Sequence, residues 1–170
     1  KRSFGWNTWL DSYGTNSDAT KEIKTIFGSK IFDTPKPVSL VEWLISLHGD
    51  EDGIVLDSFA GSGVTGHAVL ALNKRENTNR KFILIELEDY AESITAERMK
   101  RVMIGSEQIP SLGGAFDYYE LGAPLFNEDD TLNEEVGEKR IREYIYYTET
   151  REYLTREQSE EYPYLLDYHD

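Results

Sequence analysis

The fold of this 170-residue chain follows from one segment, Ile54-Val55-Leu56-Asp57-Ser58-Phe59-Ala60-Gly61-Ser62-Gly63-Val64-Thr65-Gly66-His67-Ala68-Val69-Leu70-Ala71-Leu72. Its first four residues, ending in Asp57, form a short apolar run that predicts a buried parallel strand. Gly61 and Gly63 predict a tight turn that a Cβ would obstruct. From Val64 the apolar residues follow helical spacing, with Val64, Ala68, Ala71 and Leu72 on one face. The segment therefore predicts strand, glycine loop and helix, with free backbone N–H groups where the helix starts.

The acid before the loop helps to choose a ligand. Gly61 to Gly66 fits G-x-G-x-x-G, a pattern typical of dinucleotide binding. Asp57 argues against a dinucleotide because a carboxylate there would repel the pyrophosphate, whereas it suits the cationic amino group of S-adenosylmethionine. Glu86 ends the next apolar run, Phe82–Glu86, and is placed to accept hydrogen bonds from a ribose. The alternative is a core glycine turn in which Asp57 only caps the loop.

Five segments resemble the amino-methylating DNA methyltransferases of the permuted β class, and among these most closely the modification (Mod) subunits of type III restriction–modification systems. Asp57–Gly63 is similar to the D-x-F-x-G-x-G cofactor motif of that class. The other four segments are Phe32–Ile45 with its T-x-K-P pattern, Ile85–Tyr90 followed by Ala96 and Arg98, Tyr13–Asn16, and Ala115–Leu121.

The resemblance implies a Rossmann-like S-adenosylmethionine-dependent methyltransferase fold, an α/β fold with a doubly wound, mostly parallel sheet, present here in part. It implies site-specific methyl transfer to N6 of an adenine that is flipped out of double-stranded DNA. In such a site Asp57 would bind the amino group of the cofactor, the Gly61–Gly63 loop would approach its methionine, and Glu86 would bind its ribose. The implied cofactor-binding residues are Thr34, Pro35, Lys36, Asp57, Phe59, Ala60, Gly61, Ser62, Gly63, Thr65, Glu86 and Leu87.

The sequence departs from the family at the catalytic tetrapeptide. No D-P-P-Y sequence, which holds the target adenine in these enzymes, occurs in the chain. We therefore expect the chain to be the C-terminal, cofactor-binding part of a longer enzyme, to contribute no catalytic residue, and to be inactive alone. The expected partners are DNA, mostly through the missing part, a second Mod copy in a homodimer, and the restriction (Res) subunit.

Charge divides the chain into regions. The net charge is −14, but residues 115–170 hold 16 acids and 5 bases while residues 1–114 hold 16 acids and 13 bases. We expect residues 1–33 to end a target-recognition region, residues 34–114 to bind the cofactor, and residues 115–170 to form an acidic, tyrosine-rich α+β extension. That extension is interpreted either as a partner-contacting surface or as a solvated appendage.

The remaining elements follow from local patterns. A helix is predicted over 18–27, capped by one of residues 16–18 and ended by Gly28. A second is predicted over 38–48, with Pro37 as the first helical residue, and a third over 89–103. Residues 105–114 are predicted to be a linker, 116–121 a strand, and 138–147 a helix. That last helix is expected to turn Ile141, Tyr144 and Ile145 inward. A basic group, Lys74, Arg75, Arg80 and Lys81, is interpreted as a solvated loop, with DNA-backbone contact as the alternative.

Composition excludes some kinds of site and leaves two other functions open. The chain has no cysteine, which excludes disulfides and thiolate metal sites and suits a reducing cytoplasm. Its three histidines lack metal-ligand spacing, and no apolar run reaches the length of a membrane span. Two alternatives stay open: an NAD-binding oxidoreductase, and a non-catalytic interaction module.

Overall fold

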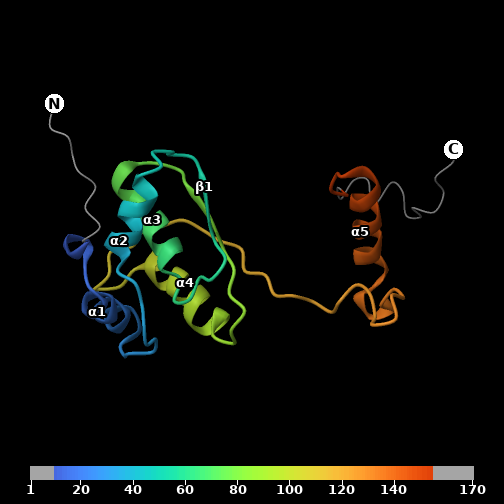
Figure 1. Cartoon of the computed structure of the whole chain (residues 1–170), viewed down its shortest axis with the longest axis horizontal. Coiled ribbons are helices and arrows are strands. Elements are labelled where there is room, and N and C mark those ends of the chain that lie inside the picture. The colour runs from blue at the N-terminus through green and yellow to red at the C-terminus, as the bar shows by residue number, and fades with distance from the viewer. Residues whose placement is uncertain (1–9, 155–170) are drawn as a thin grey trace. The chain divides into compact units, whose positions relative to one another are not determined.

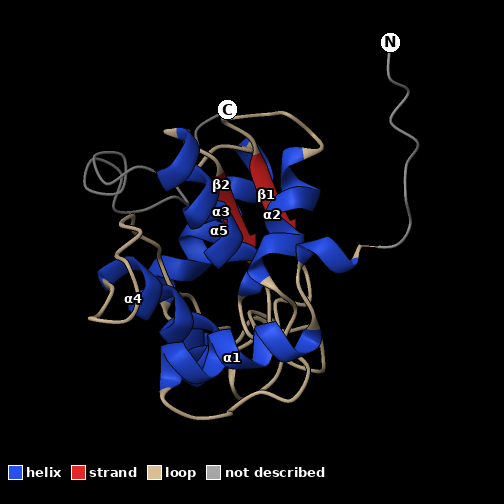
Figure 2. Ribbon diagram, turned by 90° about the vertical axis from the view of Figure 1, so that its left-hand side faces the viewer, coloured by secondary structure: helices blue, strands red, loops and turns tan. Residues whose placement is uncertain are grey.

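The computed structural model describes residues 10–154, and the chain divides into a first unit ending at Tyr118 and a second unit beginning at Tyr119 (Figure 1). The predicted strand–loop–helix is confirmed. Strand β1 (Ile54–Asp57) leads through the glycine loop into helix α3 (Val64–Glu76), and β2 (Lys81–Leu84) follows. β1 and β2 pair in parallel, from Ile54 with Lys81 to Asp57 with Leu84, as Figure 2 shows. The first unit is thus a mixed α/β structure around a small parallel sheet.

The main core lies on one face of this sheet. Its buried members are Leu70 of α3, Ile26 of α1 (Asn16–Phe27), and three residues of α4 (Glu97–Ile104), with Phe82 and Leu84 of β2 packed against them. A second cluster joins Val64 and Ala68 of α3 to Val38 of α2 (Val38–Ser46). Both clusters share α3, so α3 fixes the helices relative to the strands.

The opposite face of the sheet is exposed and, apart from Lys81, apolar, so β1 is half-exposed and not the buried strand that the sequence predicts. Because side chains alternate along a strand, one set of residues faces away from the helices, and its members keep large exposed fractions: Ile54 64%, Leu56 59%, Ile83 50% and Ile85 45%. Helices cover one face of the sheet within residues 10–118. A doubly wound sheet, which the sequence predicts, would have helices on both faces.

Helix α1 starts two residues before the predicted position and α2 one residue after it. Thr15, not one of residues 16–18, is the N-cap of α1, and it forms a capping box with Asp18. Gly28 ends the helix in the left-handed conformation, as predicted. Pro37 is the N-cap of α2 rather than its first helical residue, because its extended backbone still belongs to the preceding proline segment.

The helix predicted over 89–103 consists of two parts. A π-helix, η2 (Ala91–Ala96), precedes α4. The segment 105–114 is not a linker: the N–H of Leu112 donates to Val102 and that of Gly113 to Met103, and Ile109 and Leu112 pack on the core. Composition alone, rich in glycine and serine, hid these contacts.

Two predictions for the C-terminal region are wrong. No strand forms over 116–121, where no ladder partner lies alongside among the described residues; the second unit has an isolated bridge between Phe126 and Leu132 instead. Helix α5 (Glu138–Thr150) exists, but Tyr144 and Ile145 are exposed, 42% and 41%, and of the three predicted inward residues only Ile141 is half-buried. Two short 3-10 helices, η1 (Asp11–Tyr13) and η3 (Glu134–Val136), complete the described elements.

Candidate functional site

The two predicted acids meet at the carboxyl ends of the strands. Asp57 is the last residue of β1, and Glu86 follows β2 by two residues. The ladder continues beyond the strands, since the N–H of Ile85 donates to the carbonyl of Asp57 at 2.9 Å and that of Ala60 donates to Ile85 at 3.0 Å. These bonds place the glycine loop between the two carboxylates. Ligands of open parallel sheets bind at such an edge.

The loop needs glycine at its turn into α3. Gly61 and Gly63 have φ values of +53° and +76°, in the left-handed region that other residues rarely adopt. A Cβ on Gly63 would also lie 3.1 Å from the carbonyl oxygen of Thr95. Between the two glycines, Ser62 is buried, 3% exposed. The loop therefore lies tightly against η2, the π-helix that precedes α4.

Asp57 holds the loop from β1. Its Oδ2 accepts a hydrogen bond from Oγ1 of Thr65 at 2.6 Å, and its Oδ1 accepts one from the N–H of Phe59 at 3.1 Å. Asp57 thus caps the loop, as expected for the alternative of a core glycine turn. Because an ionised carboxylate offers about four acceptor positions, these two bonds leave capacity for a ligand.

Glu86 accepts three backbone hydrogen bonds. Its Oε2 accepts from the N–H of Gly61 at 2.7 Å, and its Oε1 accepts from Leu87 at 2.9 Å and Glu88 at 3.0 Å. The side chain is therefore fixed beside the loop. Each acid thus binds the loop through one oxygen, Oδ1 of Asp57 through the N–H of Phe59 and Oε2 of Glu86 through the N–H of Gly61. The binding of a ribose by Glu86 stays a prediction.

Among the described residues the two acids have no cation paired with them, and exposed apolar side chains lie close to each in the sequence. Within residues 10–154 neither Asp57 nor Glu86 forms an ion pair with Lys, Arg or His. Phe59, two residues after Asp57, is 86% exposed, and Leu87, the residue after Glu86, is 81% exposed. Two uncompensated carboxylates beside two exposed apolar side chains favour a ligand with hydroxyl or ammonium groups and a flat apolar part. They disfavour a phosphate.

The T-x-K-P segment approaches this site through Phe32, two residues before Thr34. Phe32 lies 3.4 Å from where a Cβ of Gly61 would be, and its ring meets Tyr90 edge-on at 5.5 Å between centroids. Thr34 and Lys36 are exposed, while Pro35 is fully buried. The structure thus brings Phe32, which the sequence did not single out as a ligand residue, directly against the loop.

Sequence reasoning missed the groups beneath the loop. Arg98 is fully buried and reaches Ser62, and Oγ1 of Thr95 donates to the carbonyl of Gly61 at 2.6 Å. Burial, followed by the charge of Arg98, lowers the pKa of His67 to about 3, and burial lowers the pKa of Arg98 to about 10. Arg98 was noted only as part of a motif, and no sequence signal marked Thr95.

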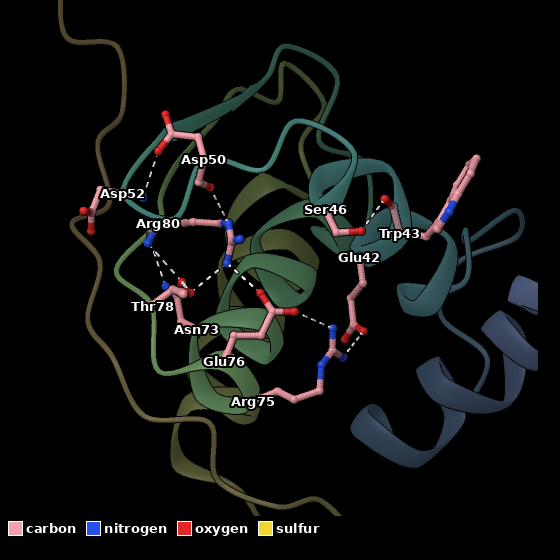
Figure 3. Close-up of polar contacts among 10 residues, drawn as sticks. All are labelled: Glu42, Trp43, Ser46, Asp50, Asp52, Asn73, Arg75, Glu76, Thr78 and Arg80. Carbon is pink, nitrogen blue, oxygen red and sulfur yellow. Dashed lines mark hydrogen bonds and ion pairs between the residues drawn. The ribbon is translucent and has the colours of Figure 1, made fainter. Parts of the chain in front are cut away.

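The basic group near β2 is not free to bind DNA as a whole. Arg80 is 6% exposed, and its guanidinium donates to the carbonyl of Asp50 and to Glu76 and Thr78 (Figure 3). Arg75 pairs with Glu42 across the helices and also with Glu76. These bonds neutralise two of the four charges, which weakens the DNA-contact alternative.

Among residues 10–154 no group of three or more His, Asp or Glu side chains could hold a metal ion. Across the same residues, none of the helices has the length and apolar character needed to cross a membrane.

Comparison with known proteins identifies the family. Residues 5–98, more than half of the chain, match the family described as DNA methylase. Over 82 residues, 48% of this chain, the sequence is 49% identical to the type III restriction-modification enzyme StyLTI Mod subunit of Salmonella typhimurium. It is 46% identical over 78 residues, 46% of the chain, to the type II methyltransferase M.KpnI of Klebsiella pneumoniae. It is 41% identical over 81 residues, 48% of the chain, to the type III restriction-modification enzyme EcoPI Mod subunit of Escherichia phage P1.

The chain spans 12% of the length of each of the two Mod subunits and 19% of that of M.KpnI. The family match covers the whole arrangement of Asp57, the glycine loop and Glu86. This chain belongs to the DNA methylase family.

Proposed function

We propose that this chain is the cofactor-binding part of a site-specific DNA methyltransferase that acts on N6 of adenine with S-adenosylmethionine as methyl donor. The observation that carries the proposal is the pair of carboxylates, Asp57 and Glu86, that flank a glycine loop and have no cation of their own. Membership of the DNA methylase family and the names of the relatives support it. A dinucleotide fits the same place less well because its phosphates would meet two negative charges.

In this proposal Asp57 accepts hydrogen bonds from the ammonium group of the cofactor and Glu86 from the ribose hydroxyls. The loop of Ala60, Gly61, Ser62 and Gly63 lies along the methionine part, and Thr65 holds the carboxylate of Asp57 beside it. Phe59 and Leu87 cover the adenine. Thr34, Pro35 and Lys36 form the opposite wall. The cofactor supplies a methyl group on a sulfonium, and the contribution of this chain is to bind and orient that group.

The reaction needs residues that this sequence lacks. A D-P-P-Y tetrapeptide, absent here, would orient the amine of an adenine flipped from double-stranded DNA. We therefore propose that the chain alone is inactive. Because the relatives include Mod subunits of type III systems, we also propose that the complete enzyme pairs with a second Mod copy and a Res subunit. A cytoplasmic location is part of the proposal, since the chain has no cysteine.

The fold and domain limits extend the same proposal. A Rossmann-like, doubly wound sheet would cover the exposed face of Ile54, Leu56, Ile83 and Ile85 with further helices. Residues 34–114 would bind the cofactor, residues 1–33 would end a target-recognition region, and residues 115–170 would form an acidic appendage.

Calorimetric titration tests the proposal. We expect the chain to bind S-adenosylmethionine and S-adenosylhomocysteine and not NAD. Asp57→Asn and Glu86→Gln keep the size and some hydrogen bonds of the side chains but remove their charge, and each is expected to weaken binding about tenfold or more. Asp52→Asn, an exposed acid two residues before β1, is the matched control and should bind as the unaltered chain does.

Binding of NAD would overturn the assignment in favour of a dinucleotide site. If neither methyl donor nor product binds, or if Asp57→Asn and Glu86→Gln bind as tightly as Asp52→Asn, the proposed site is wrong. A thermal melt of each variant separates loss of binding from loss of folding.

A further inference from the structure

Among residues 10–118, the charged side chain that is most fully buried lies under the glycine loop. Arg98, in α4, is 0% exposed. Its Nη1 donates to Oγ of Ser62 at 3.0 Å and to the carbonyl of Ser62 at 3.3 Å. Its Nε and Nη2 lie 3.3 and 3.1 Å from Nδ1 of His67. Since arginine has no acceptor, Nδ1 of His67 is the acceptor, and the imidazole is neutral with its proton on Nε2.

This arrangement is a costly way to fill a core. The nearest carboxylate, on Glu22, is 4.0 Å from Nη2 and its side chain is 35% exposed, so neutral acceptors hold most of the guanidinium. A buried cation without a close counter-ion costs stability relative to an apolar side chain of similar volume. Packing alone therefore does not explain Arg98.

Arg98 binds the middle residue of the glycine loop, the part of the site whose backbone is least restricted by its own residue types. Ser62 stands between two glycines with positive φ, whose backbone is more permissive than that of other residues. Arg98 holds the middle of the loop from below. Glu86 and Thr95 hold Gly61 through its N–H and its carbonyl, respectively.

The guanidinium of Arg98 is also connected, through Glu22, to the start of α2. Oε2 of Glu22, the carboxylate facing Arg98, also accepts from the N–H of Val38 at 3.3 Å. Val38 begins α2 directly after the proline segment that holds Pro35 and Lys36. Arg98 and the half-buried Glu22 thus link the loop before α3 to the start of α2.

We infer that Arg98 is a positioning residue for cofactor binding, which holds the Gly61–Gly63 loop in its binding conformation and sets it against the proline segment. The inference rests on the proposed function. A loop held in place in advance loses less conformational freedom when a ligand binds, and so binds more tightly.

Amide hydrogen exchange combined with calorimetry tests this role in the full chain. Arg98→Met keeps a long side chain and removes all donors. We expect exchange at the amides of Gly61 and Gly63 to become about tenfold faster, the fully buried Val69 and Leu72 of α3 to be unchanged, and the dissociation constant for S-adenosylmethionine to rise about tenfold. Arg98→Lys, which retains one charged donor group, should recover part of both effects.

Arg101→Met is the matched control on the same helix. Arg101 pairs with Glu97, donates to the carbonyl of Ile26 and lies over the ring of Phe27, so its loss should change stability but neither the loop exchange nor the affinity. Should Arg98→Met not fold, Ser62→Ala removes one of the Arg98 acceptors and is expected to give the same changes, a few-fold in size.

Three results would overturn the inference: unchanged exchange in the loop, an equal rise at Val69 and Leu72, or a loosened loop with an unchanged dissociation constant. If the unaltered chain binds no S-adenosylmethionine, the proposed function fails. The exchange measurement still decides whether Arg98 holds the loop.

Discussion

At the scale of single residues, His67 makes the first unit sensitive to acid. Its pKa falls from 6.5 to about 3 in the folded chain because of burial and the neighbouring charge of Arg98. Between these values the unfolded chain binds one more proton than the folded chain, so stability is complete above pH 6.5 and decreases as the pH falls. We expect the free energy of unfolding to drop by about 2 kcal/mol between pH 7 and pH 5 from this residue.

Urea denaturation of the chain and of His67→Gln at both pH values measures this contribution. Glutamine keeps an acceptor for Arg98 but does not titrate. Burial raises the pKa of Glu22, which acts with the opposite sign, and the comparison removes this and all other shared contributions. An equal drop in both proteins would show that His67 is not responsible.

At the scale of elements, the packing of α3 depends on Gly66. A Cβ there would lie 2.6 Å from Sδ of Met99 in α4 and 3.0 Å from Cδ1 of Leu84 in β2. Alanine is preferred over glycine inside a helix by about 1 kcal/mol, whereas overpacking a core costs about 1–3 kcal/mol. Because Met99 is 1% exposed and has little room to move, we expect Gly66→Ala to lower stability by about 1 kcal/mol.

Thermal and urea unfolding check this sign. Gly122→Ala serves as the control, because a Cβ there would meet only Arg140, at an ordinary 3.7 Å. A Gly66→Ala chain that is more stable than the original would mean that Met99 moves aside at little cost.

At the scale of the whole molecule, two features act in opposite directions on self-association: the exposed apolar face of the sheet favours it, and the negative net charge disfavours it. Parallel sheets are normally covered on both faces, and contiguous exposed apolar surface promotes association. The net charge of −14 keeps copies of the chain apart at low salt. We therefore expect self-association that increases with salt, as screening shortens the range of the repulsion to a few ångströms near 1 M.

Sedimentation velocity at low and high salt measures this association. Replacing Leu56 and Ile83 together with threonine should keep the chain monomeric at both. The matched control replaces Leu44 and Leu47, which are similarly exposed, 50% and 48%, but lie near the end of α2; it should associate as the original chain does. A chain that stays monomeric at every salt concentration contradicts the expectation.

The sequence predicts those parts of this molecule that depend on neighbouring residues. β1, the glycine loop and α3 follow from an apolar run, two glycines and helical spacing within one segment. The strand predicted over 116–121 does not form because a strand needs a partner, and the residues of the segment itself do not supply one. Composition likewise could not show that Leu112 and Gly113 bond back to the end of α4.

The site divides in the same way. Asp57 and Glu86 could be found because each ends an apolar run, and parallel strands bring such ends together. Arg98 could not be placed, since arginine is rarely buried and its partners, Ser62 and His67, lie more than 30 residues away. Phe32 could not be predicted as a site residue for a similar reason, because its contact with Gly61 depends on the path of the proline segment.

The π-helix before α4 sets where this chain tolerates a change of length. The N–H of Thr95 reaches back five residues to the carbonyl of Tyr90, so deleting the exposed Ser93 would shorten that step to the four residues of an ordinary α-helix. Tyr90 would still meet Phe32, and Thr95 would still meet Gly61. Deleting Glu97 instead would rotate Arg98 by about 100° relative to Thr95 and point it away from Ser62. We expect thermal melts to show a cooperative transition for the first deletion and its loss for the second: the helix has one residue to spare before Thr95 and none between Thr95 and Arg98.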